Sequence, residues 1–229
     1  MSGVNATNSA FALAVVGPQT LSDGSNGGLR SGRDGSLVIS QAHGRLTEAV
    51  MRGTVFSIGC ATTALSATTI TLSATATPIL AVWNPAASPV NLVMLQAGLQ
   101  AFANTLTTPV GPGAFVWAGS VGNAALTLGS APFNRKTMTA AGSQARGFPG
   151  GVALTGLTNN IVIFEGADFS TQGPLTYSTT TAMQVGAGGV QYFDGSLIVP
   201  PGGILALLNT TSTTTVSVAG RLVWEEVPV

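Results

Sequence analysis

The feature that most constrains this chain is a long stretch without charge: no Asp, Glu, Lys or Arg occurs in the 82 residues between Arg52 and Arg135. Charged residues make up only 7% of the whole chain, against about 25% in an ordinary soluble protein. The hydrophobic content of 45% is nevertheless too high for a disordered protein. We therefore expect an ordered protein whose surface is covered by hydroxyl groups, by other subunits, or by both.

The uncharged stretch does not predict a membrane span. A spanning helix needs about 20 mostly apolar residues. The best segment, Val90 to Ala103, is shorter and carries Asn91, Gln96, Gly98 and Gln100. We expect no membrane partner.

The charges that remain are divided unevenly. The chain has eight Lys and Arg against eight Asp and Glu, so its net charge is zero and gives no general attraction to nucleic acid. Residues 1–150 carry a net charge of +4, and residues 151–229 carry −4. The basic part of one subunit is thus suited to contact the acidic part of another, and a contact within one subunit is equally consistent with the sequence.

Cysteine usage and the start of the chain indicate a cytoplasmic origin. A single cysteine, Cys60, excludes an internal disulfide framework and predicts a small buried residue. A secretory signal requires positive charge before an apolar run, but the first cation is Arg30 and follows the run Phe11 to Val16.

Two regions are predicted. Residues 1–45 are rich in Asn, Ser and Gly and contain the turn pairs Asp23-Gly24 and Asn26-Gly27, which is typical of an extended N-terminal arm or of a flexible leader. Residues 46–229 are predicted to form a β-domain. At its start, Leu46, Val50 and Met51 have helical spacing, which allows a short helix before the first strand.

Short strand signals separated by Gly and Pro turns dominate the β-domain. The segment Val90 to Phe102 is long enough for a helix, but the prolines before it and the strands around it favour a long strand. The fold class predicted is all-β, a β-sandwich or jelly roll with an extended N-terminal arm. The other expected strands are Arg52–Ile58, Thr69–Leu72, Ile79–Trp83, Gly113–Trp117, Ala124–Leu128, Ile161–Glu165, Gly195–Val199, Ile204–Leu208 and Thr214–Glu226.

The sequence offers no convincing catalytic or metal site. His43 is the only histidine, and no nucleophile elbow or metal-ligand spacing surrounds it. Glu165, Asp168 and Asp194 are candidates for a carboxylate pair or a calcium site, but they lack the alternating ligand pattern of a calcium loop. The run Gly186 to Gly189 lacks the context of a phosphate loop and predicts a flexible turn. We expect no enzyme activity, no cofactor and no metal.

The three tryptophans, Trp83, Trp117 and Trp224, lie in strand-like segments. Large aromatic side chains there are typical of a core or of a subunit interface. A platform for sugar rings is the alternative if they are exposed.

A family resemblance adds a context. The run Ile79 to Pro85 followed by Asn91 to Leu95, the segment Asp194 to Gly203 and the ending Leu222 to Val229 resemble small jelly-roll virion proteins of tailed bacteriophages. The resemblance covers about residues 45–229. It implies a structural protein of the particle, often trimeric and seated on the capsid or tail, with no catalytic residues to carry over.

Composition and resemblance together predict a capsid decoration or cement protein. It would bind itself, as a homotrimer, and the major capsid protein, with the arm as an extended tie on the capsid surface of a virion assembled in the host cytoplasm. The alternative is a tail or head-fibre protein that recognises a receptor on the host surface. The residues expected at its interfaces are Arg30, Arg33, Arg45, Trp83, Trp224, Glu225 and Glu226.

Overall fold

The computed structural model describes residues 46–61, 77–103, 115–126, 129–169, 187–209 and 216–229. The chain divides into two compact units, Met1–Thr47 and Glu48–Val229. The predicted arm, His43 and the predicted strand Thr69–Leu72 lie outside the described residues. The elements in chain order are α1 (Thr47–Arg52), β1 (Val55–Ala61), β2 (Leu80–Trp83), β3 (Val90–Ala103), β4 (Phe115–Ser120), β5 (Phe133–Asn134), β6 (Arg146–Pro149), β7 (Val162–Gly166), β8 (Ala187–Tyr192), β9 (Ile198–Val199), β10 (Ile204–Asn209) and β11 (Val216–Pro228).

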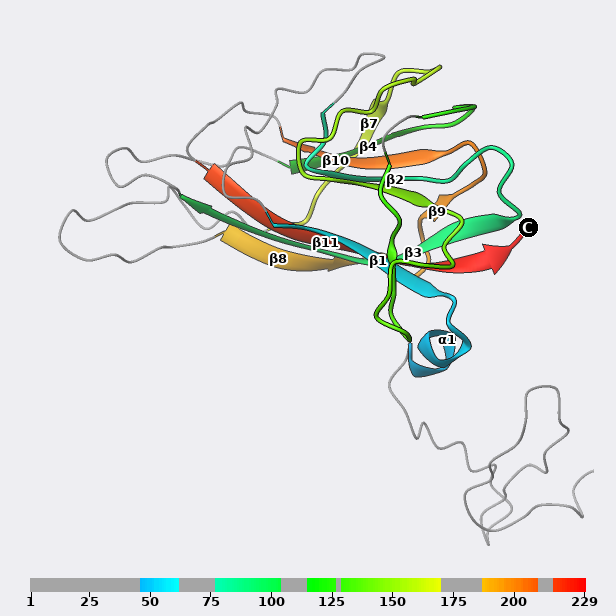
Figure 1. The fold of residues 1–229 in the computed structure, drawn as a ribbon. Coiled ribbons are helices and arrows are strands. Elements are labelled where there is room, and N and C mark those ends of the chain that lie inside the picture. Colours follow the sequence, from blue (N-terminus) through cyan, green and yellow to red (C-terminus); the bar gives the residue numbers. More distant parts are fainter. Residues whose placement is uncertain (1–45, 62–76, 104–114, 127–128, 170–186, 210–215) are drawn as a thin grey trace, which may run out of the picture. The chain divides into compact units, whose positions relative to one another are not determined.

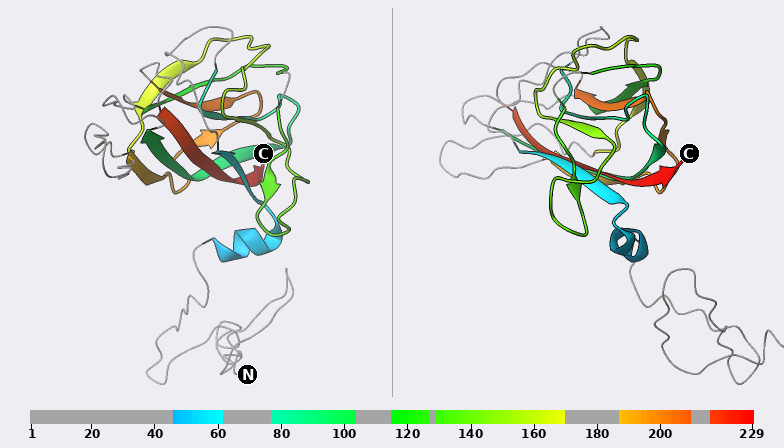
Figure 2. Two further views of the ribbon diagram at one scale, coloured as in Figure 1. Left: turned by 60° about the vertical axis from the view of Figure 1, so that its left-hand side comes forward. Right: turned by 45° about the vertical axis from the view of Figure 1, so that its right-hand side comes forward.

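The strands form two antiparallel sheets that pack face to face as a β-sandwich (Figure 1). The first sheet has the order β5-β1-β11-β3-β8, and β9 also pairs with β3. The second sheet has the order β6-β2-β10-β4-β7. The turned views show the long strand β11 running between β1 and β3 (Figure 2). The all-β sandwich expected from the sequence is confirmed.

The pairing of the strands is that of a jelly roll. If β5, β6 and β9 are set aside, eight strands remain, and they pair first with last along the chain. β1 pairs with β11, β2 with β10, β3 with β8 and β4 with β7, always antiparallel. This is one long hairpin wound into two sheets, the double-sheet winding that defines the jelly roll.

The main core lies between the two sheets and follows the two-residue alternation of strands. On β11, Leu222 and Trp224 face inward, where Ile58 and Phe56 of β1 are their register partners. Trp117 of β4 faces them from the second sheet and packs edge-on against Phe193, with ring centroids 5.3 Å apart. Because inward residues of both sheets interdigitate, this layer buries most of the large apolar side chains.

A second apolar cluster covers the face of the second sheet that points away from the first sheet. β2 and β10 are buried at every position, which requires cover on both of their faces. Leu154, Leu157 and Ile161 in the connection between β6 and β7 supply this cover, together with Phe148 of β6. The second sheet is therefore a central layer, whereas in the described part of the chain no such cluster covers the other face of the first sheet.

Two tight turns connect strands of the sandwich. Asp194 and Gly195 both have positive φ, 53° and 82°, as the two central residues of a type I′ turn require. The backbone N–H groups of Phe193 and Gly195 donate to the carbonyls of Leu95 and Met94, where β3 carries an extra residue opposite β11. This turn thus satisfies the carbonyls that the β-bulge leaves unpaired.

The second turn closes the corner before β10. Gly203 N–H donates to Pro200 O at 2.8 Å, and Gly202 has a φ of 75°. That geometry belongs to a type II turn, which needs glycine at its third position. This corner is one of the Gly and Pro turns expected between strands.

Most expected strands are found, and the differences have physical causes. Val90 to Ala103 is one long strand, as predicted, and the short helix before β1 is present. Ala124 to Leu126 was expected to lie in a strand but forms no regular structure. The glycines at 188 and 189 were expected in a flexible turn but belong to β8, because backbone pairing with β3 places them there.

Candidate functional site

The face of the first sheet that points away from the second sheet is a candidate surface, and we call it the outer face. Register partners share a side of a sheet. One row across five strands consists of Phe133, Ser57, Val223, Gln96 and Tyr192. The next rows consist of Gly59, Arg221, Gly98 and Val190, and of Ala219, Gln100 and Gly188.

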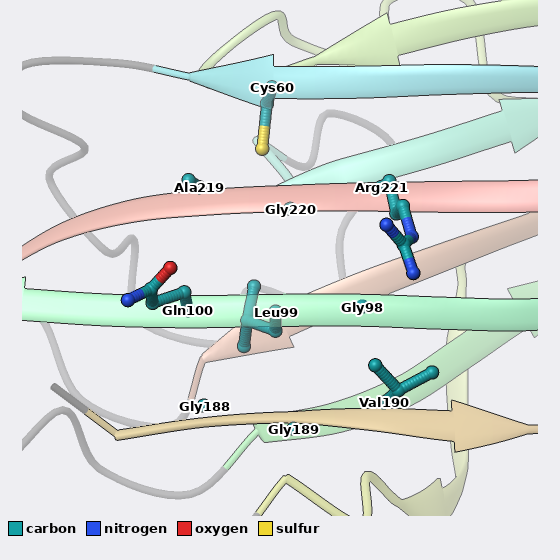
Figure 3. Close-up of a pocket in the computed structure, with 10 residues that line it drawn as sticks. All are labelled: Cys60, Gly98, Leu99, Gln100, Gly188, Gly189, Val190, Ala219, Gly220 and Arg221. Carbon is teal, nitrogen blue, oxygen red and sulfur yellow. The ribbon is translucent and has the colours of Figure 1, made fainter.

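A trough of about 590 Å³ crosses this face over β11, β3 and β8 (Figure 3). Its floor consists of the side-chain-poor positions Gly98, Gly188 and Ala219. A Cβ added to Gly188 would lie 3.0 Å from the carbonyl oxygen of Leu99, so a side chain here would crowd the backbone of the partner strand. Missing side chains, rather than a gap between elements, thus create the depression.

Arg221 is the cation of the trough. Its side chain reaches from β11 across to Gly98 on β3 (Figure 3), and a Cβ on Gly98 would lie 3.3 Å from Arg221 Cγ and Nε. Arg221 is exposed and has no hydrogen bond or ion pair with any residue of the described ranges. The guanidinium group is therefore available to a ligand.

Aromatic side chains stand at both edges of the outer face. Tyr192 on β8 is 68% exposed and Phe133 on β5 is 54% exposed. Neither was singled out as a site residue in the sequence, because exposure depends on which face of a strand is covered. The signal that was present is the alternation of Tyr192 with the inward residues Gln191 and Phe193.

A polar network at the β7–β8 side of the core was also missed. The Trp117 indole Nε1–H donates to Gln191 Oε1 at 2.8 Å, and Gln191 Nε2 donates to Glu165 Oε1 at 3.2 Å. The backbone N–H of Asp168 also donates to Gln191 Oε1. Gln191 thus links both sheets, and it contacts Glu165 through the side chain and Asp168 through the backbone.

The other candidate ligands do not assemble into a metal site. Asp194 lies in the turn between β8 and β9, which pair one after the other with β3. Within the ranges that the structure describes, no group of three or more His, Cys, Asp or Glu side chains is placed to hold a metal ion. In the same ranges, no helix is long and apolar enough to cross a membrane.

The two tryptophans expected at interfaces are buried within the chain. Trp224 is fully buried between the sheets, and Trp83 is 7% exposed in the cluster on the second sheet. Of the two places considered for them, the structure shows the core. Their indole N–H groups have no hydrogen-bond partner among the described residues.

The acidic residues at the end of β11 have partners in their own chain. Thr54 Oγ1 donates to Glu225 Oε1 at 3.2 Å. Glu226 accepts from Ser143 Oγ at 2.6 Å and from the Gln144 backbone N–H at 3.1 Å. Because Glu226 is also buried, its carboxylate holds the loop before β6. Arg30, Arg33 and Arg45, the cations expected to contact an acidic surface, lie outside the described residues.

Cys60 is buried on the inner side of β1, as expected. Desolvation raises the pKa of its thiol, although backbone hydrogen bonds partly oppose this effect. The thiol is therefore neutral at physiological pH and is a poor nucleophile.

Comparisons with known proteins yield no family and a weak structural likeness. No family model and no curated protein matches the chain. A chain of a solved structure described as "KBV activated particle at acidic pH" is similar at 14% identity, over 94% of this chain and 90% of that one, with a TM-score of 0.25. A likeness of this level gives no information about the function of this chain.

Proposed function

We propose that the chain is a virion structural protein, a capsid decoration or cement protein that binds and stabilises the head of a tailed bacteriophage as a homo-oligomer. The observation that carries the proposal is the first-with-last pairing of eight strands. Jelly rolls of this kind build viral capsids, although lectins and cupins share them. Fold alone does not select among these uses, so surface and composition must contribute.

The surface favours an assembly component. On the outer face, whose rows span the first sheet, Arg221 is the one charged residue among the twelve positions named above. Interface cores are depleted in charge and enriched in aromatic residues. Phe133 and Tyr192 at the edges of this face add exposed aromatic surface. A face of this composition suits contact with other subunits better than permanent exposure to water.

The proposed action is energetic rather than chemical. Each contact would remove apolar and Thr-rich surface from water, at about 25 cal/mol per Å² of apolar area. Many identical copies on one particle add their weak contacts by multivalency. The particle thereby gains resistance to the internal pressure of its packaged DNA. No catalytic group, cofactor or metal takes part in this proposal, and no nucleic acid or membrane is a partner.

The partners proposed are other copies of the chain, as a homotrimer, and the major capsid protein. The contacts are placed on the capsid surface of a virion that assembles in the host cytoplasm. Residues 1–45, with Arg30, Arg33 and Arg45, would extend as a tie to a neighbouring subunit. Their contact with an acidic surface is a proposal about residues outside the described ranges.

Copy number tests the proposal against its alternative. The number of copies per purified particle is measured together with the solution mass by light scattering. A stable trimer in hundreds of copies is expected for a decoration protein. A few to tens of copies located at the tail would contradict that function and favour receptor recognition by a tail or head-fibre protein.

Deletion of residues 1–40 tests the role of the arm. Every described element lies beyond this deletion, so the circular dichroism spectrum and the melting temperature should not change. Binding to undecorated particles should be lost. Binding that survives the deletion would show that the arm is not the tie.

A further inference from the structure

The trough on the outer face has the size of a ligand site. Small-molecule sites commonly measure about 300–1,000 Å³, and the trough measures about 590 Å³. Its glycine and alanine floor lets a ligand ring approach the backbone of the sheet. Arg221, Gln100 and Val190 form its walls, so polar and apolar groups both face the space.

The charge of the trough is unbalanced. Arg221 brings a positive charge, and no carboxylate of the described residues lines the trough. The nearest acid along β11 is Glu225, four residues after Arg221, and it accepts a hydrogen bond from Thr54. A guanidinium group presents donors in a fork that matches a carboxylate. The complementary ligand group is therefore an anion with two oxygens.

The remaining groups fit a saccharide. The Gln100 side chain is exposed at the trough, and an amide both donates and accepts hydrogen bonds, as sugar hydroxyl groups require. Tyr192 lies two residues beyond Val190 on the same side of β8, and its register partner is Gln96. Its exposed ring offers an apolar face with a polar end. A sugar ring has the same combination of an apolar face and a polar edge.

We propose that this trough binds a saccharide that carries a carboxylate. Arg221 pairs with the carboxylate, Gln100 bonds the hydroxyl groups, and Tyr192 stacks on a neighbouring ring. The proposal makes a different use of the outer face from the proposed function, because a subunit seated over Arg221 and Tyr192 would close the trough.

Isothermal titration of the full-length protein tests the proposal. The probe is a tetrasaccharide of alternating glucuronic acid and N-acetylglucosamine, and the matched neutral probe has its carboxyl groups reduced to alcohols. The variants are Arg221→Gln and Tyr192→Ala, and Arg135→Gln is the control because Arg135 is an exposed arginine outside the trough. Melting temperatures confirm that each variant is folded.

The acidic probe should bind at least about tenfold more tightly than the neutral probe, as expected for one charge-assisted hydrogen-bonded pair. Arg221→Gln should abolish that preference, and Tyr192→Ala should weaken the binding of both probes. Arg135→Gln should change the affinity for neither probe. Absence of binding at millimolar probe, or an unchanged preference in Arg221→Gln, would overturn the proposal. It would also fail if inorganic phosphate competes as well as the saccharide, or if Arg221→Gln changes only the oligomeric mass, which would identify a subunit contact.

Discussion

Glu226 shows how this chain uses one of its few charges internally. Its carboxylate is buried and accepts hydrogen bonds from Ser143 and from the backbone N–H groups of Gln144 and Ala145. We predict that Glu226→Gln lowers the free energy of unfolding by about 1–3 kcal/mol, because the amide group turns a donor toward buried donors. Chemical denaturation measures this loss.

The neighbouring residue supplies the matched control. Glu225 lies on the opposite side of β11 and accepts one hydrogen bond, from Thr54. Glu225→Gln keeps an acceptor oxygen for that bond, so its effect should stay within about 0.5 kcal/mol, as for most surface changes. Equal effects of the two substitutions would contradict the role given to Glu226.

Cys60 gives a second prediction at this scale. Burial raises the pKa of its thiol, so little thiolate exists in the folded protein. A thiol reagent at pH 8 should label it at least about a hundredfold more slowly in the folded than in the unfolded protein. Absorbance of the released chromophore gives both rates. Equal rates would show that Cys60 is accessible.

Residue identity predicts the burial of a side chain better than it predicts its hydrogen-bond partners. The sequence indicated that Cys60 is buried and that the tryptophans lie in strands, because large apolar or small thiol side chains seek the interior. It gave no sign that Gln191 accepts from Trp117, since these residues are 74 positions apart. Such a contact depends on the packing of two sheets and has no local signal.

At the scale of elements, the connection between β6 and β7 acts as part of the core. Leu154 is fully buried against the face of the second sheet that points away from the first sheet. We predict that Leu154→Ala costs about 2–5 kcal/mol of stability, the usual loss for a buried leucine. Val162→Ala, on the exposed side of β7, should cost under about 0.5 kcal/mol. Thermal unfolding of both variants measures the difference, and similar losses would mean that the connection does not cover the sheet.

Strand prediction succeeded where local composition and tertiary structure agree. β10 is a run of apolar residues and β3 is a long segment with many apolar residues. Both strands were expected. β8 begins Ala187-Gly188-Gly189, and glycine ordinarily weakens a strand. Backbone pairing with β3 overrides this propensity, and the same glycines create the trough. The glycines that form the depression also weaken the strand signal in the sequence, so the site was missed.

The order of the strands belongs to the whole molecule. β1 pairs with β11 from Val55–Glu225 to Ala61–Ala219, so the two ends of the domain meet. No short-range pattern encodes such pairs, because sandwiches of different order share the same alternation. The sequence therefore predicted a β-sandwich or jelly roll, and the order of its strands required the structure.

Charge scarcity leads to a prediction for the proposed homotrimer. If subunits meet through uncharged surface, salt cannot weaken the contact by screening, whereas ion pairs weaken as ionic strength rises. Glu226 is already held by its own chain, which reduces the acidic surface available to basic residues of a partner. Light scattering should give three times 22.8 kDa, unchanged from about 50 mM to about 1 M NaCl. Dissociation in high salt would assign the contact to ion pairs, and a monomer at every concentration of salt would exclude the homotrimer.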